Sequence, residues 1–504
     1  MIVNSITFLI FFSIVFILYY AGQKVLKWQQ YILLFANFVF YAWADWKMLF
    51  LLIISIIVFY ILGLLIEQYN SKNLKNSICA IGVIAGVGLL IYFKYLNFFI
   101  SSFTTLLSKI GLECNHNTLK VVMPLGISFF TFKLISYIVD VRKNEMPACK
   151  NIVTLANYIS FFPTILSGPI DKSTKLLPQF EQTHFFNYSM AVDGCRQILW
   201  GMFKKMVIAD GLALYTETNP ETAAGSTLFI LSIYYSIQLY CDFSGYSDMA
   251  IGVSKLLGYN ITPNFRYPYF AQSISEFWKR WHISLLNWFR YYIYIPLGGS
   301  RCSKGKVIRN TFIIFLVSGL WHGANWTFIF WGILHALFFL PLLLNNKPRP
   351  KVNLEEKIIF SFHSVRKIIT VFLLVNFAWI IFHADNIEQT VLIFSKIFSE
   401  SLFSKPSGVL PALPILIFAL CMFIYEWKAS NKEYALSLLP KKKILRWGLY
   451  TFKIAPPGYP NTVSTPCSFK HSISISAPFN CIVHSPCPDF ILFVWNFQNC
   501  STVS

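Results

Sequence analysis

Residues 310–346 read NTFIIFLVSGLWHGANWTFIFWGILHALFFLPLLLNN and contain no Lys, Arg, Asp or Glu. A helix needs about 20 mostly apolar residues to cross the hydrocarbon core of a bilayer, and this stretch exceeds that length. The stretch therefore predicts helices embedded in a membrane. Its two histidines, His322 and His335, are the only side chains in it with an ordinary pKa near neutral pH.

Other apolar runs extend the same character over most of the chain. Hydrophobic residues make up 56% of the 504 residues, charged residues only 13%, and the mean hydropathy is +0.55. A soluble domain carries about a quarter charged residues. We therefore expect an all-α polytopic transmembrane bundle with about 10–12 spans and additional re-entrant or interfacial helices. Uncharged runs of spanning length lie at Trp28–Ala44, Met48–Ile66, Asn76–Phe93, Thr222–Cys241, Ile368–Ala384 and Pro406–Tyr425.

The first apolar run, Ser5–Ala21, differs from a signal peptide because no charged residue precedes it. Lys24 and Lys27 follow it instead. Basic residues flank spanning helices on the cytoplasmic side. We expect a retained first span whose basic flank lies in the cytoplasm.

The net charge of +20 raises the question of nucleic-acid binding. The basic residues cluster between apolar runs, as at Arg301–Arg309 and Lys441–Arg446, where cytoplasmic loops and lipid headgroups account for them. We expect membrane lipids and no nucleic acid as partners. The eleven cysteines show no spacing typical of a metal site, so we expect no metal.

The segment 264–309 carries too many charges for a spanning helix. On one helix, Phe277, Trp281, Leu285 and Trp288 fall on a single face, which predicts an interfacial or re-entrant amphipathic helix. His282 stands on that helix in EFWKRWHISL, beside Lys279 and Arg280. Two interpretations stay open: a histidine and a basic pair at the mouth of a cavity, or a helix that anchors to headgroups.

His322 is the strongest candidate for chemistry. A helix that enters the core near Asn310 would carry His322 about 18 Å deep, close to the bilayer midplane. An ionisable group there predicts a functional site, because burying it is costly. Histidine can accept and return a proton near neutral pH, and Asn325 or the N–H of Gly323 is a candidate donor to an oxyanion. For His335, further along, we favour a neutral packed histidine.

Asp242 and Asp248 lie in CDFSGYSDMAIG at the end of an apolar run, with two serines between them. A Ser–His–Asp site is one interpretation, but no G-x-S-x-G motif occurs in the membrane region. Carboxylates that cap a helix junction are the simpler interpretation. No P-loop, dinucleotide fingerprint or H-E-x-x-H motif is present.

Several blocks resemble the membrane-bound O-acyltransferase superfamily, and within it the bacterial alginate O-acetylase branch. They are QLYCDFSGYSDMAIGVSKLLGYNITPNFRYPYFAQSISEFWKRWHISLLNWF, YIYIPLGGSR, SGLWHGANWTFIFWGILHAL, PLGISFFTF and FFPTILSGPI. The resemblance covers residues 1–450 as one transmembrane acyltransferase domain. Residues 451–504 form an atypical tail rich in Cys, Pro and Ser, for which disorder and a shifted reading frame are the two explanations.

The resemblance implies acetyl transfer to an exported polysaccharide, with helices arranged around a central funnel. It implies acetyl-CoA as the cytosolic donor, no bound cofactor, and a periplasmic or surface O-acetyltransferase as partner, in a bacterial inner membrane. His322 matches the family's catalytic histidine and His282 a second functional histidine. As substrate-binding residues we name Asn325, Trp321, Asp242, Asp248, Lys279 and Arg280.

Two alternatives remain at the level of sequence. One keeps the family and changes the acyl group, with D-alanine delivered from a carrier protein to teichoic acid. The other is a transporter for a small solute or an acyl lipid. Transporters often show internal repeats, and this chain shows none.

Overall fold

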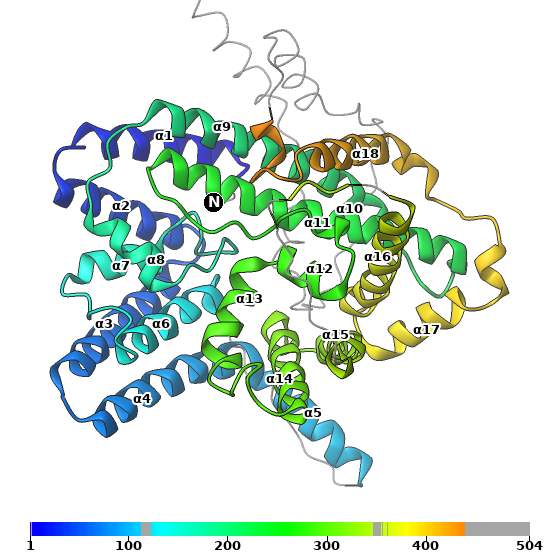
Figure 1. Cartoon of the computed structure of the whole chain (residues 1–504), viewed down its shortest axis with the longest axis horizontal. Coiled ribbons are helices and arrows are strands. Elements are labelled where there is room, and N and C mark those ends of the chain that lie inside the picture. Colours follow the sequence, from blue (N-terminus) through cyan, green and yellow to red (C-terminus); the bar gives the residue numbers. More distant parts are fainter. Residues whose placement is uncertain (2, 112–121, 346–353, 355, 360, 439–504) are drawn as a thin grey trace, which may run out of the picture.

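The computed structural model describes residues 1, 3–111, 122–345, 354, 356–359 and 361–438. These residues form helices joined by loops, with no strand among them, and several long helices run nearly parallel in the centre of Figure 1. The all-α prediction is confirmed. The tail at 451–504 lies outside the described residues.

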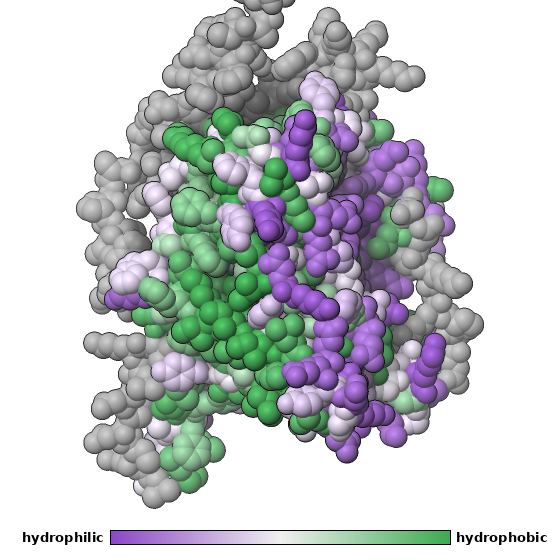
Figure 2. Space-filling view, turned by 90° about the vertical axis from the view of Figure 1, so that its left-hand side faces the viewer, coloured by the Kyte–Doolittle hydropathy of each residue, from purple (hydrophilic) through white to green (hydrophobic). Residues whose placement is uncertain are grey.

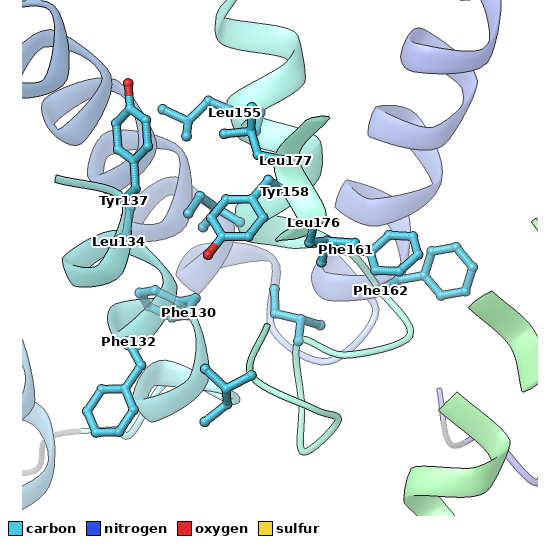
Figure 3. Close-up of a cluster of buried hydrophobic side chains, with 14 of the residues drawn as sticks. Phe130, Phe132, Leu134, Tyr137, Leu155, Tyr158, Phe161, Phe162, Leu176 and Leu177 are labelled. Carbon is cyan, nitrogen blue, oxygen red and sulfur yellow. The ribbon is translucent and has the colours of Figure 1, made fainter. Parts of the chain in front are cut away.

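The N-terminal third supplies a layer of apolar helices. Its elements are α1 (Ile6–Ala21), α2 (Leu26–Ala42), α3 (Trp46–Gln68), α4 (Lys72–Leu90), the π-helix η1 (Ile91–Tyr95), α5 (Leu96–Lys109), α6 (Ile127–Arg142) and α7 (Ile152–Ser160). Helix α6 packs against α3 and α4, and α7 packs against α2. Figure 3 shows part of the core in this region, with labelled side chains from α6, from α7 and from the residues that follow α7.

The α- and π-helices of the remaining described residues include the longest one, α11. They are α8 (Ser173–Leu176), α9 (Tyr188–Met202), the π-helix η3 (Phe203–Ala209), α10 (Asp210–Thr216), α11 (Gly225–Leu256), α12 (Ile274–Arg280), α13 (Ile283–Phe289), the π-helix η5 (Arg290–Tyr294), α14 (Lys304–His322), α15 (Trp326–Leu344), α16 (Phe362–His383), α17 (Ile387–Ile397) and α18 (Leu413–Lys428). Helix α11 packs along α9 and η3.

The stretch that indicated a membrane protein folds into two helices. Helix α14 ends at His322, and α15 begins four residues later and packs back against α14. The two backbones approach closely, because a Cβ on Gly319 would lie 2.2 Å from the carbonyl oxygen of Phe328. His322 therefore lies at a helix end. A chain that continued in one direction would carry His335 towards the far side of the membrane. The return of α15 along α14 prevents this.

The prediction of a single amphipathic helix around His282 is wrong in one respect, because the structure has two helices there, α12 and α13. His282 has φ 45° and ψ 52°, in the left-handed region, so no continuous helix passes through it. Phe277, Trp281, Leu285 and Trp288 are nevertheless all buried. The apolar pattern thus predicted burial correctly, whereas the break has no signal in that pattern.

Among the described residues, five helical segments are long and apolar enough to cross a membrane: α3, the run from α4 to α5, α15, α16 and the segment Leu410–Lys428 that contains α18. Helix α1 is shorter and also apolar. Figure 2 shows a broad hydrophobic area bordered by a strip of hydrophilic side chains. Large apolar side chains such as Phe35, Phe50 and Ile84 are exposed on α2, α3 and α4. Such a surface suits contact with lipid tails.

Candidate active site

The end of α14 places His322 in an aromatic setting. Its ring lies 5.0 Å from the ring of Trp321, 5.2 Å from Trp331 and 5.1 Å from Phe382, measured between centroids. The side chain is only partly buried. Aromatic rings thus surround His322 without burying the residue completely.

Close packing explains why the residue after His322 is glycine. Its backbone is extended, and a Cβ there would lie 2.2 Å from the ring of Phe328. Phe328 is itself buried and cannot easily move aside. Gly323 is thus required by close packing, which keeps His322 at the turn between α14 and α15.

His282 approaches the same point from another part of the chain. It is buried, its ring lies 5.8 Å from that of Trp321 and 4.7 Å from that of Phe243, and it interacts electrostatically with His322. Neither of its ring nitrogens has a hydrogen-bond partner among the described residues. A buried imidazole without partners is costly, so both nitrogens are free for a bound molecule.

His335 lies on the opposite side of His322. The ring of Trp331 contacts both histidines, and its centroid lies 4.8 Å from that of His335. The indole N–H of Trp278 donates to Nδ1 of His335 over 3.3 Å. His335 is fully buried by these aromatic neighbours, so it lacks the access that His322 has.

The two residues named beside His322 have different surroundings. Trp321 is buried and packs between the rings of His282, His322, Phe129 and Phe132. Asn325 caps α15: its Oδ1 accepts the N–H of Thr327 at 3.1 Å, and its Nδ2 donates to the carbonyl oxygen of Asp385 at 2.7 Å. The amide of Asn325 is therefore already engaged in holding the turn.

An open groove of about 500 Å³ lies next to this turn. One wall is a face of α5, and the other is the loop that follows His322. The lining mixes hydroxyl, amide, ammonium and aromatic groups: Phe98, Ser101, Ser102, Thr105, Leu106, Lys109, Ala324, Asn325 and Trp326. Ala324, in the lining, is two residues from His322 in the chain.

A polar pocket lies on the other side of His282. Asn264 and Phe265 belong to its lining, and the rings of Phe265 and His282 lie 6.5 Å apart. Its volume is about 10 Å³, room for roughly one water molecule. The amide nitrogen of Asn264 and the hydroxyl of Ser247 are buried there without partners among the described residues.

Asp242 and Asp248 are both paired with lysines of η3. Nζ of Lys204 lies 2.6 Å from Asp248, and Nζ of Lys205 lies 2.5 Å from Asp242 and 2.8 Å from Asp210. Both aspartates lie inside α11, so they do not cap a helix junction, and that simpler interpretation is wrong. Asp248 lines the polar pocket, whereas Asp242 does not.

The structure separates Lys279 from Arg280. Arg280 is buried, pairs with Glu276 at 2.9 Å and donates to the carbonyl oxygen of Arg266. Lys279 is exposed on the other side of α12. The predicted basic pair therefore does not face the histidines as one unit.

Two residues of η1 reach the end of α14 without having been singled out by sequence. Nζ of Lys94 donates to the carbonyl oxygen of Trp321, and the hydroxyl of Tyr95 donates to that of Leu320 at 2.5 Å. Lys94 is buried. The only sequence signal is a lysine directly after the uncharged run that ends at Phe93.

The arrangement suits proton transfer at a helix break. The half-buried His322 comes two residues before the lining of an open groove, and its neighbour Trp321 packs against the buried imidazole of His282, whose nitrogens have no partner among the described residues. Within the described ranges no group of three or more His, Cys, Asp or Glu side chains could hold a metal ion. General-base chemistry by His322 needs only the groups present here.

Comparison with known proteins gives consistent matches. The model of the membrane-bound O-acyltransferase family matches residues 143–361. The probable alginate O-acetylase of Pseudomonas aeruginosa is 37% identical over 410 residues, which are 79% of this chain and 75% of that protein. The peptidoglycan O-acetyltransferase of Helicobacter pylori is 34% identical over 71% of this chain and 72% of that protein.

A more distant match is the teichoic acid D-alanyltransferase of Bacillus subtilis. It is 31% identical over 236 residues, 44% of this chain and 60% of that protein. The names of the three relatives refer to O-acetylation of alginate, O-acetyl transfer with peptidoglycan, and D-alanyl transfer with teichoic acid.

Proposed function

Because this chain belongs to the membrane-bound O-acyltransferase family, we propose that it moves acetyl groups from acetyl-CoA across the membrane for the O-acetylation of an exported polysaccharide. That it is an acyltransferase of the membrane follows from the family and from the apolar helices. The acetyl group, the donor, the acceptor and the bacterial inner membrane as its location are the parts that we propose.

In the proposed reaction His322 is the general base. Its neutral imidazole takes the proton of an acceptor hydroxyl, and the hydroxyl oxygen attacks the thioester carbonyl carbon. A C–O bond forms, the C–S bond breaks, and the proton on the imidazole passes to the departing thiolate. The observation that carries this role is position: His322 is the partly accessible histidine at the break between α14 and α15.

His282 has a second role in the proposal. Its two ring nitrogens are buried and have no partner among the described residues, and the ring of Trp321 lies against both His282 and His322. A donor whose carbonyl lies between the histidines would satisfy one of these nitrogens. Trp321 would then form the wall against which the acyl group packs.

The groove beside Asn325 is where we propose that the acceptor enters. Its hydroxyl groups and the exposed ring of Trp326 are the kinds of groups that contact sugars. The donor would come from the side of the polar pocket, which is narrow here. A periplasmic or surface O-acetyltransferase is the partner expected to complete transfer to the polymer.

D-alanyl transfer from a carrier protein is the second candidate. The relative with that name matches a smaller share of this chain, 44% against 79% for the alginate O-acetylase. Acetyl transfer is therefore the better supported proposal. The polymer itself is an alginate-like or other cell-surface glycan, as the names of the two O-acetyltransferase relatives suggest.

The test is the ester-linked acetate on exported polysaccharides of a knockout strain. The strain is complemented with wild type, His322→Asn or His363→Asn, at matched protein levels in the membrane. His363 is the control because it is exposed at the start of α16. We expect acetate with wild type and His363→Asn, and loss of about 100-fold or more with His322→Asn.

Equal acetate from His322→Asn and wild type would remove His322 from the chemistry. If wild type restores D-alanine esters in place of acetate, the second candidate replaces the first.

A further inference from the structure

Helix α14 ends at His322, and side chains from another part of the chain donate hydrogen bonds to its last carbonyl oxygens. The last four carbonyl groups of a helix have no partner within the helix. Two of those in α14 accept hydrogen bonds from η1: Trp321 from the ammonium group of Lys94, and Leu320 from the hydroxyl of Tyr95. Both donors come from a segment more than 200 residues earlier in the chain.

The element that supplies these donors is unusual. The π-helix η1 interrupts the run from α4 to α5, and π-helical turns inside helices occur often at functional sites. The turn brings Lys94 and Tyr95 together onto neighbouring carbonyls of α14. η1 therefore contacts one specific place, the last turn of α14 before His322.

Burying the ammonium group of Lys94 also costs free energy. It is buried, and none of the described carboxylates forms an ion pair with it. Its contacts are the carbonyl of Trp321, the hydroxyl of Ser128 at 3.4 Å, and the rings of Tyr95 and Trp321, each 5.7 Å from Nζ. A helix C-terminus carries partial negative charge, which an ammonium group stabilises.

From these contacts we infer that Lys94 is a positioning residue for His322. By holding the carbonyl of Trp321, it fixes the end of α14, the ring of Trp321 and the imidazole that follows. The inference rests on the proposed function for its activity test but not for its structural test.

Lys133 provides a matched control. It is a second buried lysine without an ion pair to a described carboxylate, and it donates to a carbonyl oxygen, that of Tyr158, and to a hydroxyl, that of Thr164. These bonds run within the core between α6 and α7 and do not reach α14. Lys94→Met and Lys133→Met therefore remove the same kind of group at two places.

The first measurement is thiol release from acetyl-CoA in membrane vesicles that contain the full chain and an acceptor polysaccharide. A misplaced catalytic group can lower a rate about 100-fold. We expect Lys94→Met to lower kcat by about that factor with KM for acetyl-CoA within about twofold. Lys94→Arg, which can still donate to the carbonyl of Trp321, should recover part of kcat. Lys133→Met should change kcat little at a matched melting temperature.

The second measurement does not use activity. Diethyl pyrocarbonate modifies accessible imidazoles, and mass spectrometry gives the rate at His322. We expect a changed rate in Lys94→Met and the wild-type rate in Lys133→Met. If both variants lose activity only as their melting temperatures fall, or if neither changes kcat, the inference is overturned.

If wild type releases no thiol from acetyl-CoA, the proposed donor fails, and the modification rate decides about Lys94. An unchanged rate at His322 in Lys94→Met then overturns the positioning role, and a changed rate supports it.

Discussion

His282 combines two unfavourable features at the residue scale. Its backbone is left-handed, which costs a non-glycine residue roughly 1–2 kcal/mol, and its buried ring nitrogens have no partner among the described residues. The surrounding packing keeps it in place: Trp281 and Leu285, on either side, are buried. Strain of this kind concentrates at functional sites.

Replacing His282 separates its chemical role from its structural one. Asparagine tolerates the left-handed region better than most residues, so His282→Asn should leave the melting temperature nearly unchanged. We expect transfer of acetyl groups to fall about 10–100-fold, because the buried ring nitrogens are lost. The measurement is ester-linked acetate, with circular dichroism melting of the purified variant.

His184→Asn is the control, since His184 stacks near Tyr259, away from the α14–α15 turn. Full activity in His282→Asn would reduce His282 to a packing residue.

At the scale of elements, the α14–α15 pair depends on small residues at the contact. Gly319 faces the carbonyl of Phe328, and Gly332 faces that of Phe315, where a Cβ would lie 2.4 Å from the oxygen. Glycines let the two backbones approach closely, as in membrane helix pairs generally. The orientation of His322 at the end of α14 follows from this contact.

Gly319→Ala should force the two helices apart. Overpacking in a well-packed core costs roughly 1–3 kcal/mol, so we expect a lower melting temperature together with reduced transfer activity. Gly88→Ala is the control, because a Cβ on Gly88 meets nothing within 4 Å. A fully active and stable Gly319→Ala would mean that the hairpin is less tightly packed than described.

A second contact between elements is ionic. Lys204 of η3 and Asp248 of α11 are both largely buried and lie 2.6 Å apart. Removing one partner of a buried pair leaves an uncompensated charge and costs about 3–5 kcal/mol, whereas an apolar replacement of both is often tolerated.

We therefore expect Asp248→Leu and Lys204→Met each to be strongly destabilised, and the double variant to recover much of the loss. Thermal unfolding in detergent gives the interaction energy as a double-mutant cycle. Additive losses would show that the two side chains are independent.

At the scale of the whole molecule, the exposed apolar side chains require a lipid environment. Helix α3 has 23 residues, about 34 Å at 1.5 Å per residue, which matches a hydrocarbon core of about 30 Å. Basic residues follow it at Lys72 and Lys75. They favour a cytoplasmic location for the end of α3, in agreement with the cytoplasmic flank expected at Lys24.

Cysteine labelling tests this orientation. In a variant whose native cysteines are replaced, Asn70→Cys should react with a membrane-impermeant maleimide only after the cytoplasmic side is opened. Ala44→Cys, at the other end of α3, should react in intact spheroplasts. Both positions are exposed in the structure. Labelling of both from the same side would contradict a spanning α3.

The sequence by itself determined the class of the protein. Long uncharged runs require a membrane, because charged residues are costly in lipid. The family blocks around His282 and His322 identified the two histidines that the structure brings to either side of Trp321. Helix α3 agrees with its predicted run to within two residues at each end, because apolar length defines a span.

Only the tertiary structure decided where these helices end and which groups far apart in the sequence come into contact. The turn at Gly323 and the left-handed His282 depend on packing against Phe328 and Trp321, which no local pattern encodes. Asp242, Asp248 and Arg280 proved to be paired within the protein, since burial requires each charge to find a partner. Lys94 meets the end of α14 only through the fold, because hydrogen bonds between residues so far apart leave no periodic trace in the sequence.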